Sequence, residues 1–145
     1  GVDCEWEDSS LRFWLNNRFP DNAFSQEDVS KIAIRSLVVF EEEDLNSNVN
    51  ESDVKPQKEA IDRIFLLSAD EVVQYYPQLP SRLCEATDYA LSKQDSITDS
   101  CSWWLRSSND EDYYADYVQG GSGIIQSSPC SEMYFVRPAM WIKTN

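Results

Sequence analysis

The side chains with the clearest chemical potential lie in the last third of the chain, where aromatic residues alternate with carboxylates, amides and arginines. Aromatic rings stack on the apolar faces of sugars, and carboxylates and amides hydrogen-bond to hydroxyl groups. We therefore expect the loops of this segment to bind a glycan or a surface protein. The candidate ligand-binding residues are Trp103, Trp104, Arg106, Asn109, Asp110, Tyr113, Tyr117 and Arg137.

The tryptophans and arginines of this set must also be accommodated by the fold. Because neighbouring residues on a strand point to opposite faces, we expect one of Trp103 and Trp104 in the core and the other at a groove. Arg106 and Arg137 lie inside apolar runs, and an isolated buried guanidinium is very costly. We expect each to have an internal carboxylate partner, with a ligand anion as the alternative. The same partner is expected for Arg12.

The sequence names no catalytic residue. It contains no His, which excludes Ser-His-Asp and Cys-His nucleophiles and His-ligated zinc. Glycoside hydrolysis needs two opposed carboxylates, whereas Asp110, Glu111 and Asp112 are neighbours on an expected turn. We expect a non-catalytic module, with a hydrolase or modifying enzyme that uses carboxylates as an alternative.

The polar stretch over 41–57 raises the question of calcium. Oxygen-bearing side chains alternate there as they do in an EF-hand loop, but that loop would need Gly at Val49 and Glu at Lys55. We expect an exposed loop, no metal site and no cofactor, with a non-standard calcium loop as the alternative. Its weak candidate ligands are Asp44, Asn46 and Asn48.

The acidity of the chain is confined to three segments. The 145 residues carry a formal net charge of −14, and the excess lies at 3–8, 41–53 and 110–116, where no Lys or Arg occurs. Such a chain repels phosphate backbones, so we expect no nucleic-acid partner. No apolar run approaches the roughly 18 residues of a membrane span. Since 41% of the residues are hydrophobic, we expect one folded domain over 1–145.

The four cysteines, Cys4, Cys84, Cys101 and Cys130, form no C-x-x-C pair. An even count without close spacing favours disulfides over zinc or redox chemistry. We expect two disulfides in an extracytoplasmic protein, secreted or at the cell surface, with free buried thiols as the alternative. Of the three pairings, the short loop favours Cys84–Cys101, which leaves Cys4–Cys130. A start at Gly1 without Met indicates processing or trimming.

Helices are expected mainly in the first two thirds of the chain. Each follows a Ser that can accept a hydrogen bond from the backbone of the first turn, and apolar residues recur at helical spacing after it. The residues expected to open these helices are Ser9 or Ser10, Ser25, Ser68 (in a capping box with Glu71) and Ser81, and Pro20 is expected to end the first helix.

Strands are expected around and after these helices. The apolar runs 37–40 and 64–67 are typical of buried strands, and four aromatic or β-branched runs in the last third are separated by turn residues such as those at 120–123. This order predicts an α+β fold in which N-terminal helices pack on a twisted antiparallel sheet. The four late runs are 103–106, 113–118, 124–125 and 134–142.

Several segments together resemble a known family. The sequence reads W-x-x-S-x-L-R-x-W-L-N-x-x-F over 6–19, IFLLS over 64–68, WWLRS over 103–107 and VRPAMWI over 136–142. These motifs resemble a bacterial family of unknown function that is common in exported proteins of gut Firmicutes. The resemblance covers nearly the whole chain. It implies an extra hairpin before the first motif, which this chain would lack.

The resemblance also implies a fold similar to the C-type-lectin and formylglycine-generating-enzyme superfold. It implies no activity, because the family has none assigned. The calcium-binding triplets of C-type lectins are absent, and Cys101 and Cys130 do not lie in the cysteine motif of the enzymes. We expect an exported bacterial binding module, with a structural or assembly domain of a larger surface protein as the alternative.

Overall fold

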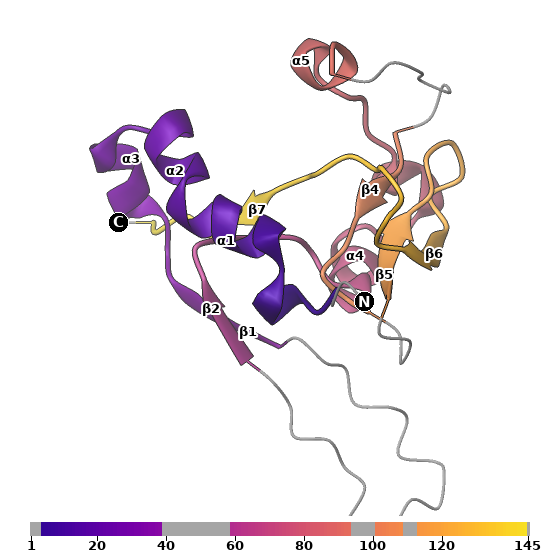
Figure 1. The fold of residues 1–145 in the computed structure, drawn as a ribbon, viewed down its shortest axis with the longest axis horizontal. Helices are drawn as coiled ribbons and strands as arrows, with labels where there is room; N and C mark the ends of the chain where they lie inside the picture. The colour runs from indigo at the N-terminus through magenta and orange to yellow at the C-terminus, as the bar shows by residue number, and fades with distance from the viewer. Residues whose placement is uncertain (1–3, 39–58, 94–100, 109–112, 145) are drawn as a thin grey trace, which may run out of the picture.

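The fold combines short helices with antiparallel strands, which confirms the α+β class (Figure 1). The structure is a computed structural model, and it describes residues 4–38, 59–93, 101–108 and 113–144. Within these residues the strand pairs fall into three small antiparallel sheets rather than one.

The N-terminal region contains a 3₁₀ helix, η1 (Trp6–Asp8), followed by α1 (Ser10–Asn17), α2 (Phe19–Ala23) and α3 (Gln26–Lys31). Ser9 and Ser25 accept hydrogen bonds from the backbone N–H three residues later, as predicted for N-caps. The predicted break at Pro20 is wrong by a few residues. Helix α1 already ends at Asn17, and Pro20 lies in the first turn of α2, where a missing N–H costs nothing.

A hairpin follows these helices. Strand β1 (Arg35–Val38) pairs with β2 (Glu59–Asp62). The predicted strand at 37–40 begins earlier, and β2 was not predicted. After β2, strand β3 (Ile64–Phe65) pairs with β7 (Ala139–Met140) instead of with the first strand.

Residues 139–142 lie at the end of this hairpin where the chain before β1 and the chain after β2 diverge. Ile142 is paired with Ile32 in an antiparallel bridge, while Met140 is paired with Ile64. The backbone N–H of Ala33 donates to Trp141 O at 2.8 Å, which fixes the segment against the end of α3. Residues distant in sequence therefore complete one small β structure.

The last third forms the third sheet from β4 (Trp103–Trp104), β5 (Tyr114–Val118) and β6 (Ile125–Pro129), in that order. The turn between β5 and β6 contains Gly121 and Gly123, both at positive φ. A Cβ on Gly123 would stand 2.3 Å from Leu79 O, so this turn packs directly on another backbone segment.

The chain between β3 and β4 contains α4 (Ala69–Tyr75), the 3₁₀ helix η3 (Leu79–Arg82) and α5 (Asp88–Leu91). The capping box of Ser68 and Glu71 is present as predicted. The helix predicted from Ser81 is wrong, because residues 83–87 are non-helical. Ala86 N–H in this segment donates to the Sγ of Cys101, two residues before β4, at 3.1 Å.

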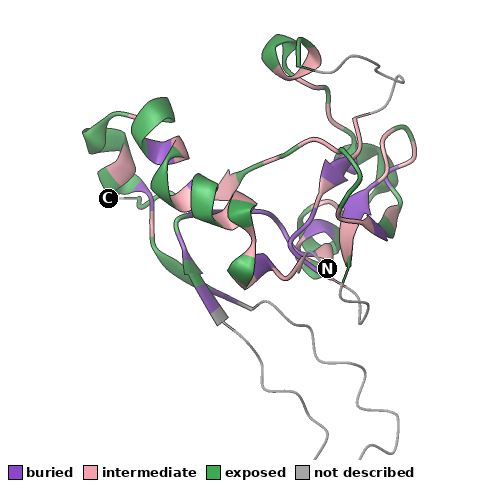
Figure 2. Cartoon of the chain, in the orientation of Figure 1, coloured by how far each residue is buried: buried purple, intermediate pink, exposed green. Residues whose placement is uncertain are grey.

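One hydrophobic core connects these parts (Figure 2). Residues 64–68 are all buried and run through its centre. On one side they contact α1, which contributes Leu15, and on the other they lie beside Leu105. A disulfide joins Cys4 to Cys130, across 126 positions of sequence.

Candidate functional site

The outer side of the C-terminal sheet carries a cluster of aromatic and polar side chains. Because side chains alternate along a strand, Trp103 and Val118 point into the core, while their neighbours Trp104 and Tyr117 point outward. Tyr134, from the segment after β6, lies over them. The aromatic face is defined here as Trp104, Tyr117, Gln126, Ser128 and Tyr134.

The rings of the aromatic face are in mutual contact. The centroids of Tyr117 and Tyr134 are 4.4 Å apart with the rings stacked, and those of Trp104 and Tyr134 are 4.7 Å apart. Tyr117 is only 8% exposed, whereas Trp104 and Tyr134 are half-buried. The indole and the Tyr134 ring therefore form the accessible part, with the stacked Tyr117 ring as support.

Polar atoms lie at the edge of these rings. The hydroxyl of Tyr117 donates to Gln126 Oε1 at 2.9 Å, and the hydroxyls of Ser128 and Tyr134 are 3.3 Å apart. Burial raises the pKa of Tyr117, and the hydrogen bond and charge of Tyr134 raise it further. The Tyr117 hydroxyl therefore keeps its proton. Gln126 has its amide nitrogen left to donate to a ligand.

The face continues along β5 toward Tyr113. Residues Tyr113, Ala115 and Tyr117 lie on the same side by strand alternation, and Cys130 N–H donates to Tyr113 O at 2.9 Å, which extends the pairing. Tyr113 is 53% exposed. Ala115 is paired with Ser128, so two small residues lie between the tyrosines.

A pocket of about 510 Å³ lies elsewhere, between α1 and the β1–β2 hairpin. Asp62 forms part of its floor and is 2% exposed. The two oxygens of this carboxylate accept hydrogen bonds from Trp6 Nε1 at 2.9 Å and from Arg12 Nε at 2.8 Å. The carboxylate partner expected for Arg12 is thereby confirmed. We refer to this cavity as the α1–hairpin pocket.

Comparison with known families decides the classification. Residues 2–144 match the family described as a domain of unknown function, DUF6273. The chain belongs to this family. No curated protein and no solved structure matches the chain. The expectation of membership in a family of unknown function is confirmed.

Two of the predicted site residues of this DUF6273 domain lie inside it. Trp103 is 1% exposed, and its Nε1 donates to Arg82 O at 3.2 Å. Arg106 is 5% exposed and binds both oxygens of Glu71, at 2.5 and 2.8 Å. The opposite faces expected for Trp103 and Trp104 and the carboxylate partner expected for Arg106 are confirmed.

Arg137 has a different environment from the one expected. Its guanidinium lies 4.9 Å from the centroid of the Trp103 ring and 5.0 Å from that of Tyr76. Nη2 donates to the Tyr76 hydroxyl at 3.3 Å, and Nη1 is buried without a hydrogen bond among the described residues. The expected carboxylate partner is wrong for these residues, because aromatic faces surround the cation instead.

The cysteines follow half of the expected pairing. Cys4 and Cys130 form a disulfide, whereas Cys84 and Cys101 are free thiols, so the predicted Cys84–Cys101 bond is wrong for this structure. Burial raises the pKa of the Cys84 thiol, although the guanidinium of Arg137 acts in the opposite direction. The thiol form of Cys84 is favoured by its surroundings.

Other expectations concern residues outside the described parts. These are the site candidates Asn109 and Asp110 and the calcium candidates Asp44, Asn46 and Asn48. Within 4–38, 59–93, 101–108 and 113–144, no three His, Cys, Asp or Glu side chains form a cluster that could hold a metal ion. In the same ranges no helix has the length and apolar character needed to cross a membrane.

Sequence reasoning found part of the aromatic face. Trp104 and Tyr117 were predicted, as was Tyr113 next to the face, because aromatic residues are dense in this part of the sequence. Gln126, Ser128 and Tyr134 were missed. Their side chains join the face only through the register of β5 with β6 and through the path of the chain after β6, which no local pattern encodes.

Proposed function

We propose that this DUF6273 domain is a non-catalytic module that binds carbohydrate through the aromatic face. The observation that carries the proposal is the contact of the Trp104, Tyr117 and Tyr134 rings on the outer side of the sheet. Rings held in place by one another present a rigid apolar surface. A ligand that stacks on such a surface loses little free energy to the ordering of side chains.

The polar edge suits hydroxyl-rich ligands. The Gln126 amide and the hydroxyls of Ser128 and Tyr134 lie beside the rings, and each can donate or accept a hydrogen bond. All five residues of the aromatic face are uncharged. The chain as a whole carries −14 and repels anions at a distance. The preferred ligand is therefore a neutral sugar rather than a uronic acid or a sulfated glycan.

The proposal includes the setting of the domain. It is part of an exported bacterial protein with a fold similar to the C-type lectins, and it acts outside the cytoplasm. The disulfide of Cys4 with Cys130 supports an oxidising compartment. Binding is independent of calcium, because the sequence lacks the calcium-binding triplets of those lectins.

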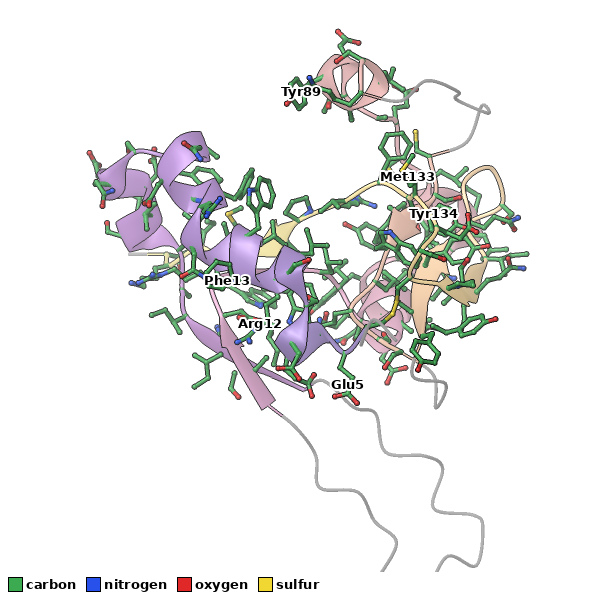
Figure 3. All side chains as sticks on the ribbon, viewed as in Figure 1. Glu5, Arg12, Phe13, Tyr89, Met133 and Tyr134 are labelled. Carbon is green, nitrogen blue, oxygen red and sulfur yellow. A yellow bond between two sulfur atoms is a disulfide. The ribbon has the colours of Figure 1, made fainter. Side chains whose placement is uncertain are left out.

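The test is a screen of the intact domain against neutral oligosaccharides, followed by titration with tryptophan fluorescence as the signal. Trp104→Ala and Tyr134→Ala each weaken binding roughly tenfold, since each removes a stacking ring. Tyr89→Ala is the matched control, because Tyr89 is 74% exposed on α5, away from the aromatic face (Figure 3). Circular dichroism verifies that the variants are folded.

Two results would contradict the proposal. One is the absence of binding to any neutral sugar at millimolar concentration by a folded domain. The other is equal affinity of the Trp104→Ala variant and the Tyr89→Ala control for the same sugar.

A further inference from the structure

We propose that the ligand of the aromatic face is a linear, β-linked neutral oligosaccharide of the cellulose type, which extends along β5 to a second stacking position at Tyr113. This inference rests on the proposed function and adds the length and the shape of the sugar to it. The case combines the spacing of the rings, the small side chains between them and the support of the Tyr113 backbone.

Aromatic rings stand at two levels along the outer side of the sheet. Trp104 is paired with Tyr117 at the first level, where Tyr134 stacks on Tyr117. Tyr113 forms the second level, because it directly precedes β5, is 53% exposed and lies by alternation on the side of Tyr117. At about 3.4 Å per residue of antiparallel strand, the two levels are roughly 14 Å apart. A pyranose ring is no larger than a tyrosine side chain, so one sugar cannot contact both.

Only small side chains of β5 and β6 lie between the two levels. Ala115 is paired with Ser128 at this point, and these are the residues of the two strands that alternation places between Tyr113 and Tyr117. The hydroxyl of Ser128 lies 3.3 Å from that of Tyr134. A ligand chain that runs along β5 therefore passes a methyl group and two hydroxyl groups on its way from one ring to the other.

The backbone of the second level is held in place. Cys130 N–H donates to Tyr113 O at 2.9 Å, and the sulfur of Cys130 is bonded to that of Cys4. Tyr113 is thereby joined to the end of β6 and, through the disulfide, to the N-terminal region. A fixed backbone reduces the ordering cost when a ligand stacks on this ring.

These features select a straight, uncharged chain of at least three sugar rings, one at each level and one between them. Both levels project from one side of a sheet, so the sugar rings must follow a straight line to reach both. Cellulose-type β-linked glucose forms such a straight ribbon, and its rings present apolar faces for stacking. The α-linked chain of starch is curved, so it stacks at one level only.

The test is isothermal titration calorimetry of the intact domain with cellobiose, cellotetraose and maltotetraose. Cellotetraose binds about tenfold more tightly than the other two, since it alone contacts both levels. Tyr113→Ala lowers the affinity for cellotetraose about tenfold and thereby removes its advantage over cellobiose. Trp104→Ala weakens the binding of all three sugars, because each of them uses the first level.

The control variants separate the ring of Tyr113 from its surroundings. Tyr113→Phe keeps the advantage of cellotetraose, because it keeps the ring. Tyr114→Ala also keeps this advantage, since alternation places the neighbouring tyrosine on the opposite side of β5. Circular dichroism verifies the fold of each variant. Tyr89→Ala, on α5, takes the place of Tyr114→Ala if that variant does not fold.

The outcomes distinguish this inference from the function on which it rests. Binding of no neutral sugar by the folded domain would contradict both. Equal affinity for cellobiose and cellotetraose, or binding of other neutral sugars alone, would overturn the inference and leave the carbohydrate function in place. The same conclusion would follow if Tyr113→Ala kept the advantage of cellotetraose.

Discussion

The Glu71 carboxylate binds the Arg106 guanidinium and caps helix α4 at the same time. Its two oxygens accept from Arg106 Nη1 and Nη2 at 2.5 and 2.8 Å, and Oε2 also accepts from the Ser68 backbone N–H at 3.0 Å. Arg106 additionally donates to Leu66 O at 2.8 Å. One side chain therefore connects the start of α4 to the strand segment after β4.

Replacing Glu71 by Ala should lower the free energy of unfolding by about 3 kcal/mol, because it removes a carboxylate bound to the buried Arg106 cation and half of a capping box. The measurement is urea unfolding followed by circular dichroism. Glu27→Ala is the matched control, since the Glu27 side chain is 80% exposed in its pair with Lys31. That control should lose less than about 1 kcal/mol. Equal losses in the two variants would contradict the role given to Glu71.

Replacing Gly123 by Ala should destabilise the domain by about 3 kcal/mol, because an L-residue is strained at its φ and the new methyl group meets backbone. The φ of Gly123 is +74°, and the added Cβ would stand 2.3 Å from Leu79 O. Gly121→Ala provides the comparison, since Gly121 has a φ of 79° and is exposed. It should cost about 1 kcal/mol. If thermal unfolding showed the same shift for both, the contact with Leu79 would not be what constrains the turn.

The stability of the domain should depend on the protonation of Asp116. Burial raises the pKa of this carboxyl, against a hydrogen bond from Ser127 that lowers it. The folded state therefore holds this proton more tightly. The contribution of Asp116 to stability is fully present below pH 3.8, the ordinary value, and is lost as the pH rises through the raised pKa. Asp116→Asn should raise the melting temperature at pH 7 and have little effect at pH 3.

The control for this prediction is Asp21→Asn, at an exposed position, which removes one negative charge from a chain of net charge −14. Relief of general repulsion would act on both variants alike. If both variants raised the melting temperature at pH 7 by the same amount, the local environment of Asp116 would not be the cause.

The sequence predicts this fold best where the determinant is local. Ser9, Ser25 and Ser68 each bond to a backbone N–H three residues later, so the signal and its partner lie within one turn. The helix predicted from Ser81 fails for the opposite reason. The Ala86 N–H donates to the sulfur of Cys101, two residues before β4, and tertiary contacts of this kind outweigh the local helical spacing.

The contrast between local and tertiary determinants also explains which site residues could be predicted. The carboxylate partners of Arg12 and Arg106 were expected on electrostatic grounds alone, although their identities as Asp62 and Glu71 were not. The positive charge of Arg137 lies against the rings of Tyr76 and Trp103 instead of against a carboxylate. The α1–hairpin pocket was not predicted, because β2 itself was missed and its residues have no strong periodic pattern.

The position of Ile142 between the diverging strands has a consequence for biosynthesis. The first strands of the hairpin leave the ribosome long before residues 139–143, which must pair with Ile32 and Ile64 to complete that part of the core. The nascent N-terminal region cannot reach its final state until residues 139–143 have left the ribosome. Folding of this domain is therefore a late, long-range event, and the incomplete chain exposes apolar strand edges for which chaperones compete.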